Sequence, residues 1–284
     1  DPRRTYRVSG TPNDSVMYSI AVYNEPEPGA WPNRTIGVLY DDAMPLDGDG
    51  RFSCVLGPAR PAGYDGPFIA LDEDARGVLT RDYHEDPAHG RRVDWAIEVV
   101  DHGGQPVTAL KTDESVAKSL RSALRYAQDM FNIVPLVLAP PGSQDGLDNA
   151  FAPPYRAGGA THGYSMQDAV YCLGAFSLEP AEALVITSRH PKCRFWNLTV
   201  WNQYMAAPDL EYGRGGINSG TAVPNSDGSV TIVISREQLE HPNAISTKDH
   251  PEGLLSFRWF HADDLPDHLT TAVVRVGEAP TGVV

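Results

Sequence analysis

The chain has 284 residues, of which 41% are apolar and 21% charged, as in an ordinary globular protein that can bury a large core. Its net charge of −14 argues against nucleic acids and anionic membranes as partners, because both are bound through clusters of Lys and Arg. No apolar run is long enough to cross a bilayer, and the 26 Gly and 24 Pro favour short strands joined by turns.

The first half of the chain carries strand patterns separated by turns. Residues 16–23 alternate between two faces with a period of two, which predicts a strand. Asp47-Gly48-Asp49-Gly50 predicts a turn. Apolar runs on either side of polar loops predict further strands at 52–56, 77–83 and 93–100.

One amphipathic helix is predicted between the two halves. Thr112 can cap its N-terminus, Asp113 and Glu114 favour the positive end of its dipole, and Pro135 is expected to end it. Six apolar residues share one face, which is expected to pack on a sheet or between the halves: Val116, Leu120, Ala123, Leu124, Ala127 and Phe131. Residues 139–163, rich in Pro and Gly, predict a long ordered loop that crosses between the halves.

The second half repeats the pattern of the first. Strands are predicted at 184–187, 195–201, 230–234, 254–260 and 270–276. The run FWNLTVWN at 195–202 follows MYSIAVYN at 17–24 with an offset of 178 residues, and Asp227-Gly228 follows Asp49-Gly50 with the same offset. With an offset of 177, RWFH at 258–261 follows RDYH at 81–84, and 270–276 follows 93–99. Matching blocks in the same order predict a duplication.

These patterns predict a mainly β fold of two duplicated antiparallel sandwiches, jelly-roll or Greek-key in type, with one linking amphipathic helix. One continuous double sandwich is the alternative. The expected domains are an N-terminal repeat at 1–105, the helix and crossing loop at 106–165, and a C-terminal repeat at 166–284.

The three cysteines, Cys54, Cys172 and Cys193, each lie in or beside an apolar strand-like run. They are expected to be buried free thiols, and a Cys172–Cys193 disulfide is the alternative. Neither Cys nor His residues show a metal-ligand spacing, so the sequence predicts no metal and no other cofactor. A cytoplasmic location is favoured over export.

The strand at 195–202 suggests a binding surface. Its alternation puts Trp196, Leu198 and Val200 on one face, as core. The other face carries Phe195, Asn197, Thr199 and Trp201. Aromatic rings interleaved with an amide and a hydroxyl can stack on a ligand ring and hydrogen-bond to its edge, as in carbohydrate sites. Packing of this face against other parts of the protein is the alternative.

Four histidines are candidates for acid–base chemistry. His84 and His261 end equivalent strands and are followed by acids, a symmetry that duplication alone can explain. His162 lies in the crossing loop, and His250 lies in a loop before a strand. Either of these two could line a ligand site and act as a general base.

Several motifs of the second half resemble the family known as domain of unknown function 1214, DUF1214. They include NAFAPPYR at 149–156, LGAFSLEPAEALVI at 173–186, CRFWNLTVWNQYM at 193–205, DGSVTIVIS at 227–235 and GLLSFRW at 253–259. The first half resembles the region that often precedes this domain in bacterial, especially actinobacterial, members. The resemblance implies a jelly-roll-type β fold and assigns no catalytic residues.

The leading hypothesis from the sequence is a site for a small polar, ring-bearing ligand, such as a sugar or glycoside, between the two repeats. The expected binding residues are Arg156, Asn197, Trp201, Asn218, Asn243 and Arg258. If the protein is catalytic, acid–base hydrolysis or elimination is expected, with His250 or His162 as the base. The alternative is a non-catalytic binding or assembly module, with the aromatic strand face in a subunit contact and a homo-oligomer as its product.

Overall fold

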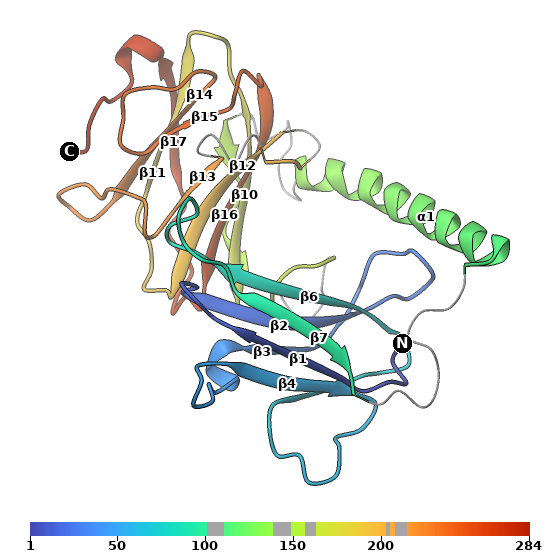
Figure 1. The fold of residues 1–284 in the computed structure, drawn as a ribbon. Coiled ribbons are helices and arrows are strands. Elements are labelled where there is room, and N and C mark those ends of the chain that lie inside the picture. Colours follow the sequence, from blue (N-terminus) through green and yellow to red (C-terminus); the bar gives the residue numbers. More distant parts are fainter. Residues whose placement is uncertain (101–110, 139–148, 157–162, 203–204, 208–214) are drawn as a thin grey trace. The chain divides into compact units, whose positions relative to one another are not determined.

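A computed structural model describes residues 1–100, 111–138, 149–156, 163–202, 205–207 and 215–284, without the side chains of 133–138 (Figure 1). The chain is mainly β, and it divides into two compact units. The N-terminal unit holds residues 1–130 and 158–165, and the C-terminal unit holds 131–157 and 166–284. The segment expected at 106–165 as a link is therefore shared between the units.

The N-terminal unit contains two sheets, with strand orders β5-β4-β1-β7 and β3-β2-β6. Its strands are β1 (Tyr6–Thr11), β2 (Met17–Asn24), β3 (Thr35–Tyr40), β4 (Phe52–Gly57), β5 (Phe68–Ala70), β6 (Ala75–Tyr83) and β7 (Asp94–Val99), with a 3₁₀ turn at Asp41–Ala43. Alternate side chains of β1, β2 and β4, such as Val8, Ile20 and Cys54, form one buried cluster. The two sheets thus pack face to face, as in a sandwich.

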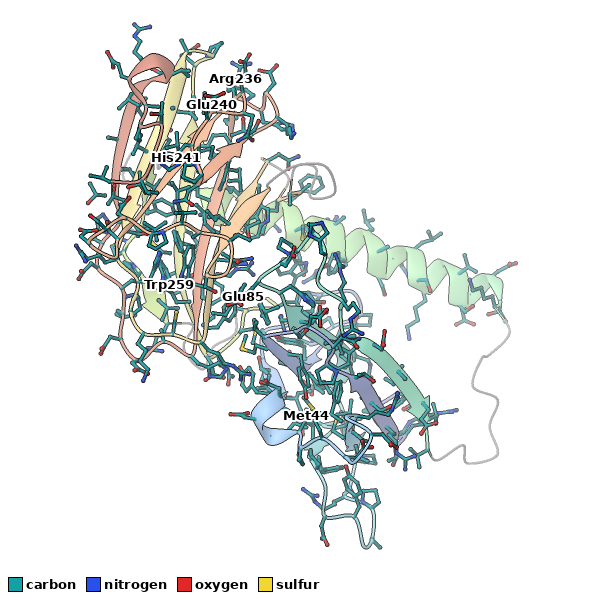
Figure 2. The ribbon with its side chains drawn as sticks, turned by 60° about the vertical axis from the view of Figure 1, so that its left-hand side comes forward. Met44, Glu85, Arg236, Glu240, His241 and Trp259 are labelled. Carbon is teal, nitrogen blue, oxygen red and sulfur yellow. The ribbon has the colours of Figure 1, made fainter. Side chains whose placement is uncertain are left out.

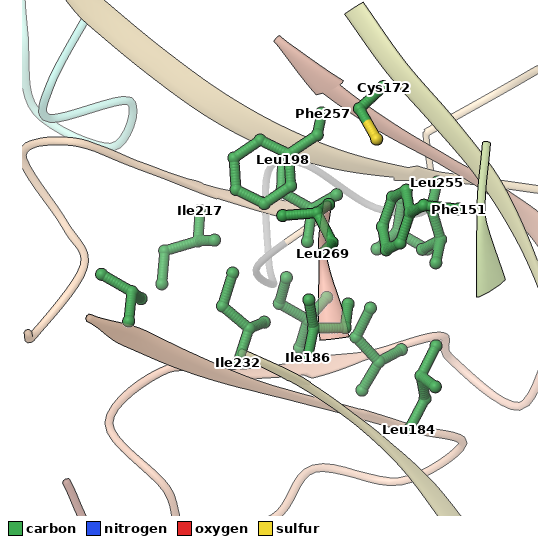
Figure 3. Packing of buried hydrophobic residues seen from close by; sticks show 14 of the residues in the cluster. Phe151, Cys172, Leu184, Ile186, Leu198, Ile217, Ile232, Leu255, Phe257 and Leu269 are labelled. Atoms are coloured by element: carbon green, nitrogen blue, oxygen red, sulfur yellow. The ribbon is translucent and has the colours of Figure 1, made fainter. Parts of the chain in front are cut away.

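The C-terminal unit also contains two sheets, with strand orders β15-β14-β11-β17 and β13-β12-β16-β10-β8, and β9 pairs with β10. Its strands are β8 (Ala150–Phe151), β9 (Tyr155–Arg156), β10 (Ala169–Ser177), β11 (Glu182–Ser188), β12 (Phe195–Trp201), β13 (Gly216–Asn218), β14 (Val230–Ser235), β15 (Ala244–Ser246), β16 (Glu252–Phe260) and β17 (Thr270–Arg275), followed by a 3₁₀ turn at Val276–Glu278. Leu198 and Phe257 of one sheet and Ile186 and Ile232 of the other point into the same core (Figure 3).

Strand order is the same in the two units. The order β5-β4-β1-β7 corresponds to β15-β14-β11-β17, and β3-β2-β6 corresponds to β13-β12-β16. Each four-stranded sheet contains one parallel pair, β4 with β5 and β14 with β15. Strands β8, β9 and β10 of the C-terminal unit have no counterpart among the described strands of the N-terminal unit.

The two predicted turns also have the same backbone hydrogen bonds. In the first turn, Asp47 N donates to Arg51 O at 2.8 Å and Gly50 N donates to Asp47 O at 3.0 Å. In the second, Asn225 N donates to Ser229 O at 2.7 Å and Gly228 N donates to Asn225 O at 3.0 Å. The side chains of Asp47 and Asp227 accept further backbone N–H groups and so fix each turn locally.

The helix α1 (Asp113–Leu138) begins where its cap predicts. Oγ1 of Thr112 accepts the N–H of Ser115 at 3.2 Å, and Oγ of Ser115 accepts the N–H of Thr112 at 2.9 Å. The predicted end at Pro135 is wrong, because the helix runs on to Leu138. A proline removes one N–H donor, a loss that a long helix can tolerate. No helix among the described residues is long and apolar enough to cross a membrane.

The expectation that the apolar face of α1 is core is also wrong. Leu120, Leu124 and Phe131 are 66%, 61% and 73% exposed. The helix instead contacts the N-terminal unit through its polar flank, where Asp129 accepts the N–H of Trp31 and Arg125 pairs with Glu27. Periodicity shows which residues share a face, but a polar flank with good partners can still decide which face packs.

Candidate functional site

Strand β12 has the two faces that its sequence predicts. Trp196, Leu198 and Val200 lie in the core of the C-terminal unit. Asn197, Thr199 and Trp201, on the other face, are half-buried. Phe195, which the alternation also assigns to this face, is buried. Asn197, Thr199 and Trp201 are therefore the groups of this strand that remain partly accessible to a ligand.

Strand pairing extends this face into a row across the sheet. Asn197 of β12 lies opposite Asn218 of β13 on one side and opposite Arg258 of β16 on the other. Arg258 in turn lies opposite Tyr171 of β10, and Tyr171 opposite Tyr155 of β9. Because cross-strand partners point to the same side, these five residues share the outer face.

Arg258 lies at the centre of the row and is half-buried. Its Nε donates to Oδ1 of Asn197 at 3.1 Å, and its Nη2 donates to Oγ1 of Thr199 at 3.4 Å. Its Cζ lies 5.8 Å from the ring centroid of Phe260. Among the described residues, Arg258 has no carboxylate partner, and its Nη1 donates no hydrogen bond.

Other arginines of the same unit are neutralised by acids. Arg189 pairs with Asp227, and Arg236 pairs with Asp249. Arg258 is held only by neutral oxygens, so its positive charge and its Nη1 hydrogens remain available on a partly dehydrated surface. Such a group binds an acceptor oxygen more strongly than an exposed arginine does.

Aromatic rings flank Arg258 on this face. Tyr155 and Tyr171 stack with ring centroids 5.8 Å apart, and Phe195 and Phe260 pack with centroids 6.0 Å apart. Burial raises the pKa of Tyr155, so its hydroxyl stays protonated. Phe195 and Phe260 are themselves buried, so Tyr155 and half-buried Tyr171 are the rings of these two pairs that present accessible surface beside the cationic donor.

Three predicted binding residues form hydrogen bonds with backbone groups of the protein. Asn243 is fully buried, and its amide donates to the carbonyls of Val223 and Thr231 and accepts the N–H of Val223, each at 2.8 Å. Oδ1 of Asn218 accepts the N–H of Gly220 and closes a turn. Arg156 donates to the backbone carbonyl of Ala262 at 2.7 Å.

Of the two candidate bases, His250 lies in the described part of the chain and is not part of this face. His250 is exposed in the turn before β16, and its side chain donates or accepts no hydrogen bond with a described residue. His162 lies outside the described residues. Nε2 of His84 forms a hydrogen bond with Oδ2 of Asp82 at 2.9 Å. In the part of the chain that the structure describes, no group of three or more His, Cys, Asp or Glu residues could hold a metal ion.

A histidine that the sequence did not single out lies in an aromatic cluster at the core. Nε1 of Trp259 donates to Nδ1 of His190 at 3.0 Å, and the His190 ring stacks on Trp196 with centroids 4.0 Å apart (Figure 2 labels Trp259). Burial lowers the pKa of His190 to about 4. An indole can only donate, so His190 is neutral with its hydrogen on Nε2, facing Ser188. The sequence around His190 does not indicate that His190 accepts a hydrogen bond from Trp259, because these two residues lie far apart in the sequence.

The three cysteines are free, as expected, and the Cys172–Cys193 disulfide does not form. Burial raises the pKa of the Cys54 and Cys172 thiols to about 12 and that of Cys193 to about 11. At neutral pH these thiols are protonated and poorly nucleophilic.

Two surface hollows lie in the N-terminal unit. One, of about 590 Å³, is lined by Asp1, Arg3, Asp72, Glu73 and Arg76 together with neighbouring Pro and Leu residues, so its charges are mixed. The other, of about 320 Å³, follows the exposed apolar side of α1. Neither has the combination of an unneutralised arginine and flanking rings that the row around Arg258 has.

Comparison with solved structures places this fold among known ones. A crystal structure of an uncharacterized protein from Burkholderia cenocepacia matches with a TM-score of 0.85 at 23% identity, over 98% of this chain and 75% of that chain. The VPA0106 protein from Vibrio parahaemolyticus matches with a TM-score of 0.50 at 14% identity, over 96% of this chain and 86% of that chain. These similarities concern the fold alone.

Sequence comparison gives a family for the central part of the C-terminal unit. No curated protein matches the chain at a significant level. Residues 178–264, which contain β11 to β16 and thus both Asn197 and Arg258, match the family model described as "Protein of unknown function (DUF1214)". The family resemblance seen in the motifs is confirmed: the chain carries a DUF1214 match over residues 178–264.

Proposed function

We propose that the C-terminal unit binds a small polar, ring-bearing molecule, such as a sugar or glycoside, on the outer face of its six-stranded sheet. The observation that supports this proposal most strongly is Arg258, a half-buried arginine without a carboxylate partner among the described residues. Nη1 of Arg258 would donate to ligand oxygens, while Asn197 and Thr199 hold the guanidinium in place.

The physical reason is the cost of leaving a cation without an acceptor. A guanidinium that is partly removed from water loses hydration, and neutral amide and hydroxyl oxygens replace only part of it. A ligand with hydroxyl or carboxylate oxygens would supply the missing acceptors. Stacked Tyr155 and Tyr171 and half-buried Trp201 supply surfaces of the kind that pack on sugar rings.

We propose binding rather than catalysis as the function of this face. Hydrolysis or elimination by acid–base chemistry needs a base within hydrogen-bond reach of the reacting group. His250, one of the two bases expected from the sequence, is exposed and forms no side-chain hydrogen bond with a described residue. A role for His162 as base rests on the sequence alone.

We also propose that the two units are copies of one jelly-roll-type ancestor. Their identical strand orders, the parallel pair in each, and the matching hydrogen bonds of the two turns support a duplication. Seven strands of the N-terminal unit recur in the same order in the C-terminal unit, each at a similar distance along the sequence from its counterpart. Such a match is hard to obtain by independent origin. On this view β8, β9 and β10 were added to the copy that carries Arg258.

The experiment is a thermal-shift screen of the full chain against monosaccharides, uronic acids and aryl glycosides. A ligand that prefers the folded state raises the melting temperature. We expect at least one sugar-like ligand to do so for the wild type and not for Arg258→Met. Arg236→Met is the matched control, because Arg236 is paired with Asp249 and should leave the shift unchanged. Equal shifts for the wild type and Arg258→Met would exclude the proposed site.

A second candidate function, self-assembly, is favoured by the exposed apolar side of α1. The occupant that fits is a second copy of α1 in antiparallel orientation. Its acidic first turn, Asp113 and Glu114, would then lie near basic Arg121 of the other copy. Sedimentation velocity tests this: a monomer at all concentrations contradicts it, and a dimer that Leu124→Ser dissociates supports it.

A further inference from the structure

The three-stranded sheet of the N-terminal unit has a buried hydroxyl without a partner. Ser19, on the outer face of β2, is 0% exposed, and its Oγ forms no hydrogen bond among the described residues. Leaving a buried hydroxyl without a partner is unfavourable, so native proteins rarely retain one without a reason. Ser19 lies directly opposite Arg81 of β6, and both side chains point to the same face.

Arg81, like Ser19, has a hydrogen-bond donor without a partner among the described residues. Its Nη2 donates to Oη of Tyr23 at 3.0 Å and to the carbonyl of Tyr164 at 2.5 Å, and its Cζ lies 5.7 Å from the Tyr23 ring centroid. Its Nη1 is buried and has no hydrogen-bond partner among the described residues. No ion pair within the described chain includes Arg81, whereas Arg34 and Arg91 of the same unit both pair with acids.

A short backbone segment and an aromatic cluster adjoin Arg81. Besides the Arg81 bond to the Tyr164 carbonyl, Oη of Tyr23 donates to the carbonyl of Ser165 at 3.3 Å. The Tyr164 ring packs on Tyr23 and Trp31, with centroid distances of 5.2 and 5.8 Å. Gly163 has φ +63°, and a Cβ there would lie 2.5 Å from the Trp31 ring, so only glycine permits this approach.

Trp31 adds a third unused donor to this neighbourhood. Its Nε1 is buried and has no hydrogen-bond partner among the described residues. The buried Nη1 of half-buried Arg81, a buried hydroxyl and a buried indole N–H therefore adjoin one cluster of tyrosine rings. The guanidinium and the indole need acceptors, and the hydroxyl can donate to one as well, but the described protein provides none.

We infer that Arg81 and Ser19 bind the carboxylate of a small organic acid whose ring packs against Tyr23, Tyr164 and Trp31. Nη1 of Arg81 and Oγ of Ser19 each donate to the carboxylate, and Nε1 of Trp31 donates to a second acceptor on the ligand. A carboxylate suits one guanidinium edge and one hydroxyl, because its single charge balances that of Arg81. A phosphate dianion would keep an excess negative charge there.

Arg81 of the N-terminal unit and Arg258 of the C-terminal unit occupy equivalent positions in the strand pairing of their units. Arg81 lies opposite Ser19 in the pair of β2 with β6, and Arg258 lies opposite Asn197 in the pair of β12 with β16. The inference rests on the unpartnered donors of the N-terminal unit and not on the function proposed for the C-terminal unit.

The test uses benzoate as the probe and the full chain carrying Arg258→Met, so that binding at the other arginine does not contribute. Ionic strength is held constant with NaCl. We expect benzoate to raise the melting temperature and calorimetry to give one site per chain. Benzyl alcohol, which has the ring without the charge, and inorganic phosphate are expected to give no shift at the same concentration.

Ser19→Ala, added to Arg258→Met, is the decisive variant because it removes an unpartnered hydroxyl and should fold. Without benzoate its melting temperature should equal or exceed that of its parent. Its benzoate affinity should fall about tenfold, the effect of losing one hydrogen bond to a charged group. Arg76→Met, which alters an exposed arginine of the same strand, should bind benzoate like its parent.

Three results would overturn the inference. One is no stabilisation by benzoate beyond that of NaCl. Another is equal benzoate affinity in the presence and absence of Ser19→Ala. The third is an equal shift with phosphate or with benzyl alcohol, because either would show that a ring-bearing carboxylate is not what the site selects.

Discussion

Asn197 of β12 and Arg258 of β16 lie directly opposite each other, and Oδ1 of Asn197 accepts the Nε hydrogen of Arg258 at 3.1 Å. This bond fixes the plane of the guanidinium on the outer face of the sheet. The orientation of Nη1 therefore depends on a neighbour as well as on Arg258 itself. Asn197 is in this sense a positioning residue for the proposed ligand.

Asn197→Ala should weaken ligand binding without unfolding the protein. Loss of the bond lets the guanidinium rotate, so we expect affinity to fall about tenfold and stability to fall by about 1 kcal/mol. Calorimetric titration of the best ligand from the screen, together with a urea melt, measures both. Asn132→Ala, at an exposed position of α1, is the control and should change neither quantity. Unchanged affinity in Asn197→Ala would show that Asn197 does not position Arg258 for the ligand.

Asn243→Ala should instead destabilise the fold. The fully buried amide makes three hydrogen bonds with backbone groups of Val223 and Thr231, and truncation leaves those groups without partners. We expect a loss of about 3 kcal/mol in the free energy of unfolding, measured by urea denaturation. Ligand affinity of the folded variant should be unchanged, and a selective loss of binding would restore Asn243 as a ligand residue.

His190 should make stability depend on pH. Its pKa is about 4 in the folded protein and 6.5 in an unperturbed chain. Unfolding therefore takes up a proton between these values, so the contribution of neutral His190 is complete above pH 6.5 and is lost as pH falls toward 4. The limiting loss is about 3 kcal/mol.

The variant His190→Gln isolates this effect. Glutamine can still accept from Trp259 and does not titrate. As pH falls from 6.5 to 4, the unfolding free energy of the wild type should decrease relative to that of the variant. Above pH 7 the difference between the two should stay constant. A difference that does not change across the acidic range would show that His190 is not held neutral by its surroundings.

The exposed side of α1 should tolerate truncation. Leu124→Ala removes a side chain that is 61% exposed, so we expect unfolding free energy to change by less than about 0.5 kcal/mol. Leu198→Ala, in the core between the sheets, should lose about 2–5 kcal/mol. If urea melts of dilute protein showed equal losses of unfolding free energy for Leu124→Ala and Leu198→Ala, the apolar side of α1 would be packed against the protein.

Much of the strand arrangement could be predicted from the sequence. The strand at 195–201 was predicted with both its bounds and its two faces, because period-two alternation next to a hydrophobic core is a strong signal. Short strands such as β13 and β15 escaped prediction, since three residues carry too little pattern. Strand β1 was also missed, because its alternation is weak at both ends.

The candidate site could be predicted only in part. Asn197, Thr199 and Trp201 are grouped correctly on one face by the sequence, because strand alternation determines the side on which a residue lies. That Arg258 lies opposite Asn197 depends on strand pairing, which the sequence does not show. Asn243 and Arg156 were included because they lie in family motifs, but their roles depend on which carbonyls fold beside them. The same limit applies to Ser19 and Arg81, whose missing partners become visible only when burial and pairing are known.

A crystal structure of the protein soaked with the best sugar-like ligand tests most directly whether Arg258 binds the ligand. We expect ligand oxygens within hydrogen-bond distance of Arg258 Nη1, with the ring on the aromatic surface of the same sheet face. A ligand bound elsewhere, with Arg258 still held only by Asn197 and Thr199, would contradict it.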